Sequence, residues 1–150
     1  MKRYLIFAAV GPLLGGFWLL LTTTIMSGYW NEPLTAAQVG KLLKVFFTTL
    51  QYSYLFGFLP ALMIGAIDDI LSHVRRIAPV ARMLLVGVIA FAASELAYGG
   101  RGPDAGAFQF VMYGLVGFIP GAVNSWLVHK LVGELPDAPA QPPAEKAAGA

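Results

Sequence analysis

The sequence predicts an all-α protein, a bundle of four transmembrane helices with both chain ends on the same side of the membrane. Four long apolar runs are separated by short segments that hold nearly all of the charge. Hydrophobic residues make up 57% of the 150 residues, charged residues make up 12%, and the mean hydropathy is +0.68. These values are far from those of a water-soluble domain. A soluble domain of this size has too much surface for its volume to bury four such runs.

Each run is long enough to cross a bilayer, for which about 20 apolar residues suffice. The expected spans are residues 4–26, 45–67, 79–98 and 105–128. They form one predicted transmembrane domain at 1–134. Residues 135–150 are rich in Pro and Ala, and such a composition cannot bury enough surface to become ordered. We therefore expect a flexible tail there.

Orientation follows from the basic residues, because Lys and Arg are retained on the cytoplasmic side of short loops. Seven of the ten fall on one side of the predicted spans: Lys2, Arg3, Arg75, Arg76, Arg82, Lys130 and Lys146. Lys41, Lys44 and Arg101 fall on the other side. The asymmetry predicts that both termini, and therefore the tail, are cytoplasmic.

Two connecting segments have features of their own. Between Asn31 and Lys44, apolar residues near helical spacing favour a short surface helix capped by Thr35, and a plain polar connection is the alternative. Between Asp68 and Arg82 we expect the second helix to continue for a turn or two. The third helix should then begin at Pro79, because proline suits the first position of a helix.

A short motif occurs twice. LFGFLPA at 55–61 and LVGFIPG at 115–121 share Gly, Phe and Pro in register, and both lie in spans that run in the same direction. A true repeat would relate two helical hairpins by a pseudo-two-fold axis along the membrane normal. Pro12, Pro60 and Pro120 should kink three of the four helices. The kinks serve either as hinges or as bends that improve packing.

Small residues spaced four apart allow helix backbones to approach closely. Such residues occur in three of the spans, at Gly11, Gly15, Gly57, Ala61, Gly65, Gly117 and Gly121. Gly114 lies on the same stripe of the fourth span as Gly117 and Gly121. They predict tight helix packing, either within the chain or with a partner.

Polar residues at membrane depth suggest one candidate site. Glu95 is the only acid well inside a span, where a charge costs about 3 kcal/mol. Glu95 would serve as a proton or cation site, together with Thr48 and Gln51 in the polar outer half of the first two spans. The alternative is that Glu95 reaches the outer headgroups or pairs with Arg101. Threonines in that outer half can also simply bond to their own helix backbone.

A second cluster lies near the inner surface. Asp68 and Asp69 are adjacent acids that could hold Mg²⁺ over a lipid phosphate, as in membrane transferases. A solvated, self-paired elbow explains them equally well. The nearby Arg75, Arg76 and Arg82 are candidates for contact with anionic lipid headgroups.

Other chemistry has little support in the sequence. There is no Cys, and G-x-S-x-G, H-E-x-x-H and phosphate-binding glycine motifs do not occur. The net charge of +2 is too small to indicate nucleic acid. We expect no catalytic residues, metal or cofactor.

The opening MKRYLIFAAVGPLLGGF, together with the four-span plan and its GF-x-P turns, resembles a family of small bacterial inner-membrane proteins of unknown function. The resemblance covers the chain up to about Leu135. It implies a bacterial inner membrane and no particular activity.

Three functional hypotheses follow. The first is a non-enzymatic packing, assembly or accessory protein that associates with itself or with a larger membrane complex. The second is a small dimeric transporter or channel that uses Glu95 and the Thr-rich outer half of the first two spans. The third is a lipid-modifying enzyme at Asp68 and Asp69.

Overall fold

Four long helices make up the part of the chain that the structure, a computed structural model, describes: residues 2–31, 35–74, 77–99 and 106–133. The helices are α1 (Lys2–Met26), α2 (Ala36–Ser72), α3 (Pro79–Tyr98) and α4 (Ala107–Val132). Each is long and apolar enough to cross a membrane. The predicted all-α, four-span class is therefore confirmed, and the chain is a multi-pass membrane protein. The tail expected at 135–150 lies outside the described residues.

The start of α2 includes the segment that was expected to form a separate surface helix. Thr35 caps this helix as predicted: its hydroxyl accepts a hydrogen bond from the backbone N–H of Gln38 at 3.3 Å. The side chain of Gln38 accepts in return from the backbone N–H of Thr35 at 3.0 Å. This reciprocal capping box satisfies two backbone donors that a helix start leaves free. The helix then continues without a break into the membrane span, so a polar connection at residues 36–44 is wrong.

The turn between α2 and α3 follows the sequence-based expectation. α2 continues past Ile67 as far as Ser72, and α3 begins at Pro79, its first helical residue. The fixed φ of proline matches the helix, and its missing N–H would have had no partner at that position.

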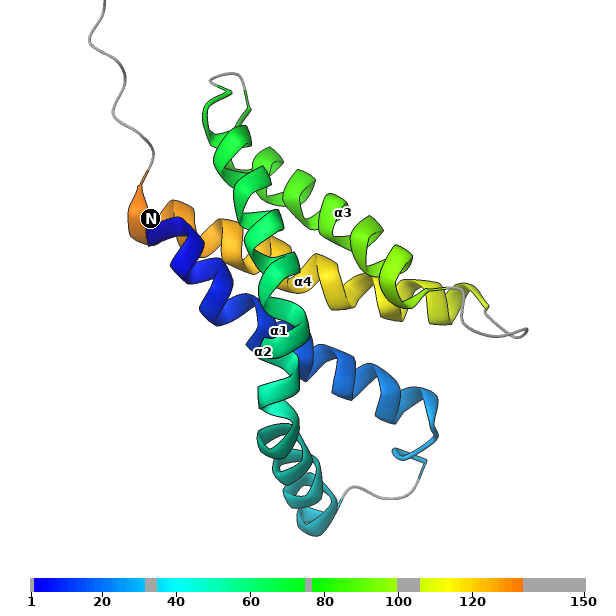
Figure 1. Ribbon diagram of the computed structural model, residues 1–150. Helices are drawn as coiled ribbons and strands as arrows, with labels where there is room; N and C mark the ends of the chain where they lie inside the picture. Colours follow the sequence, from blue (N-terminus) through cyan, green and yellow to red (C-terminus); the bar gives the residue numbers. More distant parts are fainter. Residues whose placement is uncertain (1, 32–34, 75–76, 100–105, 134–150) are drawn as a thin grey trace, which may run out of the picture.

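The four helices differ in how closely they pack (Figure 1). α4 lies along both α3 and α1, and α1 also packs against α2, whereas α2 meets α3 and α4 only briefly. We call the end formed by the start of α1, the end of α2, the start of α3 and the end of α4 the terminal end, and the opposite end the distal end. At the distal end α2 diverges from α1.

Small residues line the interface between α1 and α2. Gly11 lies against Ala61, so that a Cβ added at Gly11 would stand 2.9 Å from the Ala61 Cβ. Gly57 lies against Pro12, and Gly65 lies against the ring of Phe7. The small residues of α2 therefore face α1.

A second stripe of small residues joins α4 to α3. Gly114 lies against the ring of Phe91, Gly117 against the carbonyl of Ala90, and Gly121 against the Ala90 Cβ, 2.8 Å from where its own Cβ would be. On the other side of α4, Pro120 approaches Gly15 of α1. Van der Waals contact of this kind holds helices together where lipid solvates apolar side chains as well as protein does.

The three prolines expected to kink helices all lie inside continuous helices: Pro12 in α1, Pro60 in α2 and Pro120 in α4. A proline disturbs the backbone one turn before it. In α1, a side chain of α2 supplies a hydrogen bond to that turn: the Tyr54 hydroxyl donates to the Ala9 carbonyl at 2.5 Å.

Candidate functional site

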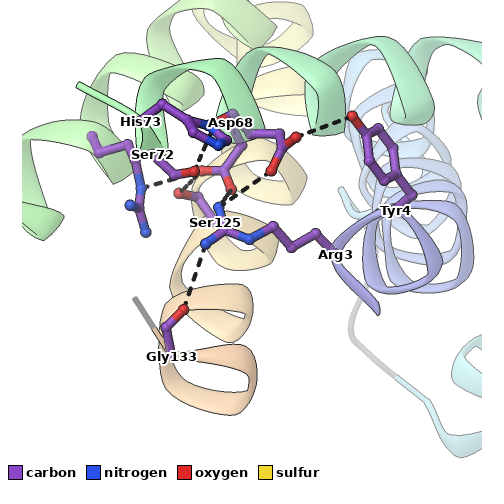
Figure 2. Close-up of polar contacts among 9 residues, drawn as sticks. Arg3, Tyr4, Asp68, Ser72, His73, Ser125 and Gly133 are labelled. Carbon is purple, nitrogen blue, oxygen red and sulfur yellow. Dashed lines mark hydrogen bonds and ion pairs between the residues drawn. The ribbon is translucent and has the colours of Figure 1, made fainter. Parts of the chain in front are cut away.

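A cluster of charged and polar side chains occupies the terminal end, and all four helices contribute to it (Figure 2). We call it the ion-pair cluster. Its members are Arg3 of α1, Asp68 and Asp69 of α2, Arg82 of α3, and Ser125 of α4. These residues come from positions up to 122 apart in the sequence, so only the tertiary structure brings them together.

Asp68 is the centre of the cluster, and its side chain is fully buried. The Ser125 hydroxyl donates a hydrogen bond to Asp68 Oδ1 at 2.5 Å. Arg82 Nε lies 3.5 Å from the same oxygen, and Arg3 Nη1 lies 3.9 Å from Oδ2. The carboxylate thus has one short hydrogen bond and two positive neighbours, which compensate the cost of burying its charge.

Arg3 links the second acid and the end of α4 to this centre. Its Nη1 lies 3.7 Å from Asp69 Oδ1, and its Nη2 donates to the carbonyl of Gly133 at 3.5 Å. Gly133 follows the last residue of α4, where the helix dipole attracts a positive charge. The Tyr4 hydroxyl completes the arrangement by donating to Asp69 Oδ2 at 3.4 Å.

The two arginines balance the two aspartates, so the cluster carries no net charge. Arg3 and Arg82 are themselves buried, at 8% and 4% exposure. Asp68 already interacts with three side chains, and no group of three or more His, Cys, Asp or Glu capable of holding a metal ion occurs among the described residues. The chemistry that this geometry performs is mutual neutralisation, which joins the ends of four helices.

Arg82 corrects one expectation from the sequence. It was assigned to headgroup contact with Arg75 and Arg76, yet it turns inward and pairs with Asp68. The physical reason is that a fully buried carboxylate attracts a buried cation more strongly than a headgroup in water does. Arg75 and Arg76 lie outside the described residues.

Glu95, the proposed ion site, lies near the distal end of α3 and is partly exposed. Its Oε1 atom is buried and has no hydrogen-bond partner in the described part of the chain. The neighbouring Ser94 is engaged elsewhere, since its hydroxyl donates to the Tyr113 carbonyl of α4 at 2.7 Å. Arg101, the alternative partner, lies outside the described residues.

Thr48 and Gln51 are not brought to Glu95. Both are exposed on the half of α2 that diverges from the other helices (Figure 1). Thr48 donates to the Lys44 carbonyl of its own helix at 2.8 Å. Thr49, Thr23 and Thr24 likewise bond to carbonyls of their own helices. Most threonines in the outer half of the first two spans therefore make their hydrogen bonds within their own helix, as threonine does in membrane helices.

Thr22 is the exception among these threonines. It is fully buried, and its hydroxyl reaches across from α1 to the Met112 carbonyl of α4 at 3.5 Å. Together with the contact of Ser94 to α4, it shows how hydroxyl groups join helices in the distal half.

The charged members of the ion-pair cluster were all singled out in the sequence, but they were not paired with one another. Arg3 was counted as a topology signal, Asp68 and Asp69 as metal candidates, and Arg82 as a headgroup contact. Ser125 was missed as a member of the site. The available signal was their common depth: each lies near the same end of its helix. Opposite charges at one depth in separate helices predict a pairing when no water is present to separate them.

The comparisons with known proteins give a family for the chain but no activity. A model of a family of unknown function (DUF5413) matches residues 1–134. The chain belongs to this family. The match covers all four helices of the DUF5413 member and ends one residue after Gly133, whose carbonyl Arg3 contacts. No curated protein and no solved structure matches the chain.

Proposed function

We propose that this DUF5413 member is a non-enzymatic protein of the bacterial inner membrane, with both termini in the cytoplasm, that acts as an assembly or accessory subunit. One observation carries the proposal: a stripe on the exposed face of α2 that has the amide of Gln51 near its centre. The stripe consists of Thr48, Gln51, Tyr52 and Leu55, which share one face of the helix because they are spaced three and four apart.

The stripe lies at the depth of the hydrocarbon. α2 has 37 residues, which makes it about 55 Å long, against about 30 Å of hydrocarbon. Gln51 lies close to the middle of the helix, between Ala36 and Ser72. Gln51 lies six residues inside the expected span 45–67, about 9 Å from its outer end.

The amide of Gln51 lacks a hydrogen-bond partner among the described residues, and Gln51 is exposed. Tyr52 is 55% exposed and Leu55 71%. An unpaired amide in hydrocarbon costs several kcal/mol, and a neighbouring helix is the usual source of a partner. The face around Gln51 therefore favours contact with another membrane helix.

The buried charges of the ion-pair cluster are paired within the chain. Asp68 is held by Arg3, Arg82 and Ser125. This pairing supports a structural role over the alternative of a lipid-modifying enzyme.

The test is association of the full chain in mild detergent and in proteoliposomes, measured by native gel, by cross-linking and by identification of co-purifying proteins. Gln51→Leu should weaken association about 5- to 30-fold, because an interhelical hydrogen bond contributes about 1–2 kcal/mol. Gln109→Leu makes the same chemical change on α4 and serves as the matched control, with association unchanged. A monomeric wild-type protein without co-purifying partners, or a Gln51→Leu variant that associates normally, would refute the proposal.

A small dimeric transporter is the second candidate, favoured by the buried and unbonded Oε1 of Glu95. It predicts that Glu95→Gln abolishes a flux across proteoliposomes while thermal stability is kept. A flux that persists in Glu95→Gln would remove this candidate.

A further inference from the structure

A groove opens between α1 and α2 at the distal end, where the two helices diverge. Its volume is about 310 Å³. It is lined by Leu20, Thr24, Tyr29, Lys41, Leu42, Lys44 and Val45. One turn deeper along α1, Phe17 meets Phe46 edge to face with ring centroids 5.4 Å apart. The helices are therefore in contact below the groove and separate above it.

The polar groups at the rim differ in whether they are already used. The Tyr29 hydroxyl donates to the Gln38 carbonyl at 3.2 Å. Thr24 accepts from Trp30 Nε1 at 3.0 Å and donates to the Leu21 carbonyl at 2.9 Å. These hydroxyl groups are occupied within the chain.

The two lysines are different. Lys41 and Lys44 are exposed, stand one helical turn apart on α2, and form no ion pair with the described residues. Below the two lysines, the walls of the groove consist of Leu20, Leu42 and Val45, and the contact of Phe17 with Phe46 closes it from beneath. The groove thus combines two positive charges at its mouth with an apolar interior.

We propose that this groove binds an anionic phospholipid. The phosphate lies between the ammonium groups of Lys41 and Lys44, and the first part of one acyl chain lies against Leu20, Leu42 and Val45. Only an amphiphile matches both halves of the site: a soluble anion leaves the apolar walls without a partner, and a neutral hydrocarbon leaves the lysines without one. Lysines near a membrane surface attract anionic lipids, and their aliphatic stems lie along apolar surface.

The experiment is native mass spectrometry of the purified full chain, titrated with phosphatidylglycerol or phosphatidylcholine. Each lysine near the surface contributes roughly a fivefold preference for the anionic lipid, so the wild-type protein should bind one phosphatidylglycerol about 30-fold more tightly than phosphatidylcholine. The double variant Lys41→Gln/Lys44→Gln should bind the two lipids equally. Lys130→Gln, at the terminal end where Lys130 lies over the Trp126 ring, is the matched control and should keep the preference.

A second variant tests the groove without altering charge. Val45→Trp places an indole in the apolar interior and keeps both lysines, and it should abolish binding of phosphatidylglycerol. Three results would overturn the proposal: unchanged binding in both groove variants, an equal loss in Lys130→Gln, or competition by inorganic phosphate at the concentration of the lipid. The last result would show that the apolar walls have no part in binding.

Discussion

Removing the charge of Asp68 tests whether the ion-pair cluster holds the four helices together. Asp68→Asn keeps the size and shape of the side chain but removes its negative charge. Arg82, only 4% exposed, would then face no opposite charge, whereas Arg3 would keep Asp69 at 3.7 Å. The variant therefore leaves one buried cation without its partner.

The expected magnitude follows from this geometry. Removing one partner of a buried ion pair costs about 3–5 kcal/mol, and an unpaired arginine in a membrane helix costs about 3 kcal/mol. Because Arg3 retains an acid, we expect a loss in the free energy of unfolding near the lower end, about 3 kcal/mol. Asp69→Asn is the matched control. The Asp69 side chain is 34% exposed, so water screens its charge and its loss should cost less than about 1 kcal/mol.

The assay is equilibrium unfolding in mixed micelles of a mild detergent and sodium dodecyl sulfate, followed by the fluorescence of the three tryptophans. A rescue variant separates charge from packing. Asp68→Leu combined with Arg82→Met removes both charges and should recover most of the stability, because apolar residues often replace a buried ion pair without loss.

Equal losses in Asp68→Asn and Asp69→Asn would refute the reasoning, since burial would then have no influence on the cost. A rescue variant as unstable as Asp68→Asn would show that the loss came from packing around Asp68 and not from an unpaired arginine.

Three further predictions concern packing, capping and orientation. Gly121→Ala should lower stability by about 1–3 kcal/mol, because its Cβ would stand 2.8 Å from that of Ala90. In the control Gly40→Ala the new Cβ meets nothing within 4 Å, so stability should rise by up to about 1 kcal/mol. Equal shifts in melting temperature would contradict the assigned interface. Thr35→Ala should cost about 1 kcal/mol and speed hydrogen exchange in the first turn of α2 alone; unchanged exchange there would show that the cap contributes nothing. Reporter fusions at each terminus should both be cytoplasmic, because the basic residues predominate on that side, and opposite locations would exclude four spans.

The repeated GF-x-P motif shows what the tertiary structure adds to a sequence pattern. Gly57 faces α1 and Gly117 faces α3, so each copy packs against the preceding helix of its own hairpin. The surroundings of the two copies nevertheless differ. Pro120 is buried because α4 lies between α1 and α3, whereas Pro60 is exposed because α2 lies at the side of the bundle.

The sequence by itself determined the number of spans, their approximate limits and several helix ends. Thr35 and Pro79 mark helix starts by their own backbone chemistry, and apolar runs mark spans because a backbone in lipid must satisfy its hydrogen bonds within a helix. The apolar runs underestimated α1 and α4 at the terminal end, where these helices begin at Lys2 and end at Val132, and they underestimated α2 at the distal end, where it begins at Ala36. Charged residues such as Arg3 and Lys130 looked like the beginning of the aqueous segments.

Only the tertiary structure decided which helix faces meet and which charges pair. In a soluble protein the apolar face of a helix marks the side that is buried. In a membrane the lipid is as apolar as the protein interior, so every face of a span looks alike in the sequence. Arg3, Asp68, Arg82 and Ser125 therefore shared a depth that could be read from the sequence, but only the packing of small residues between the helices brought them to the same side.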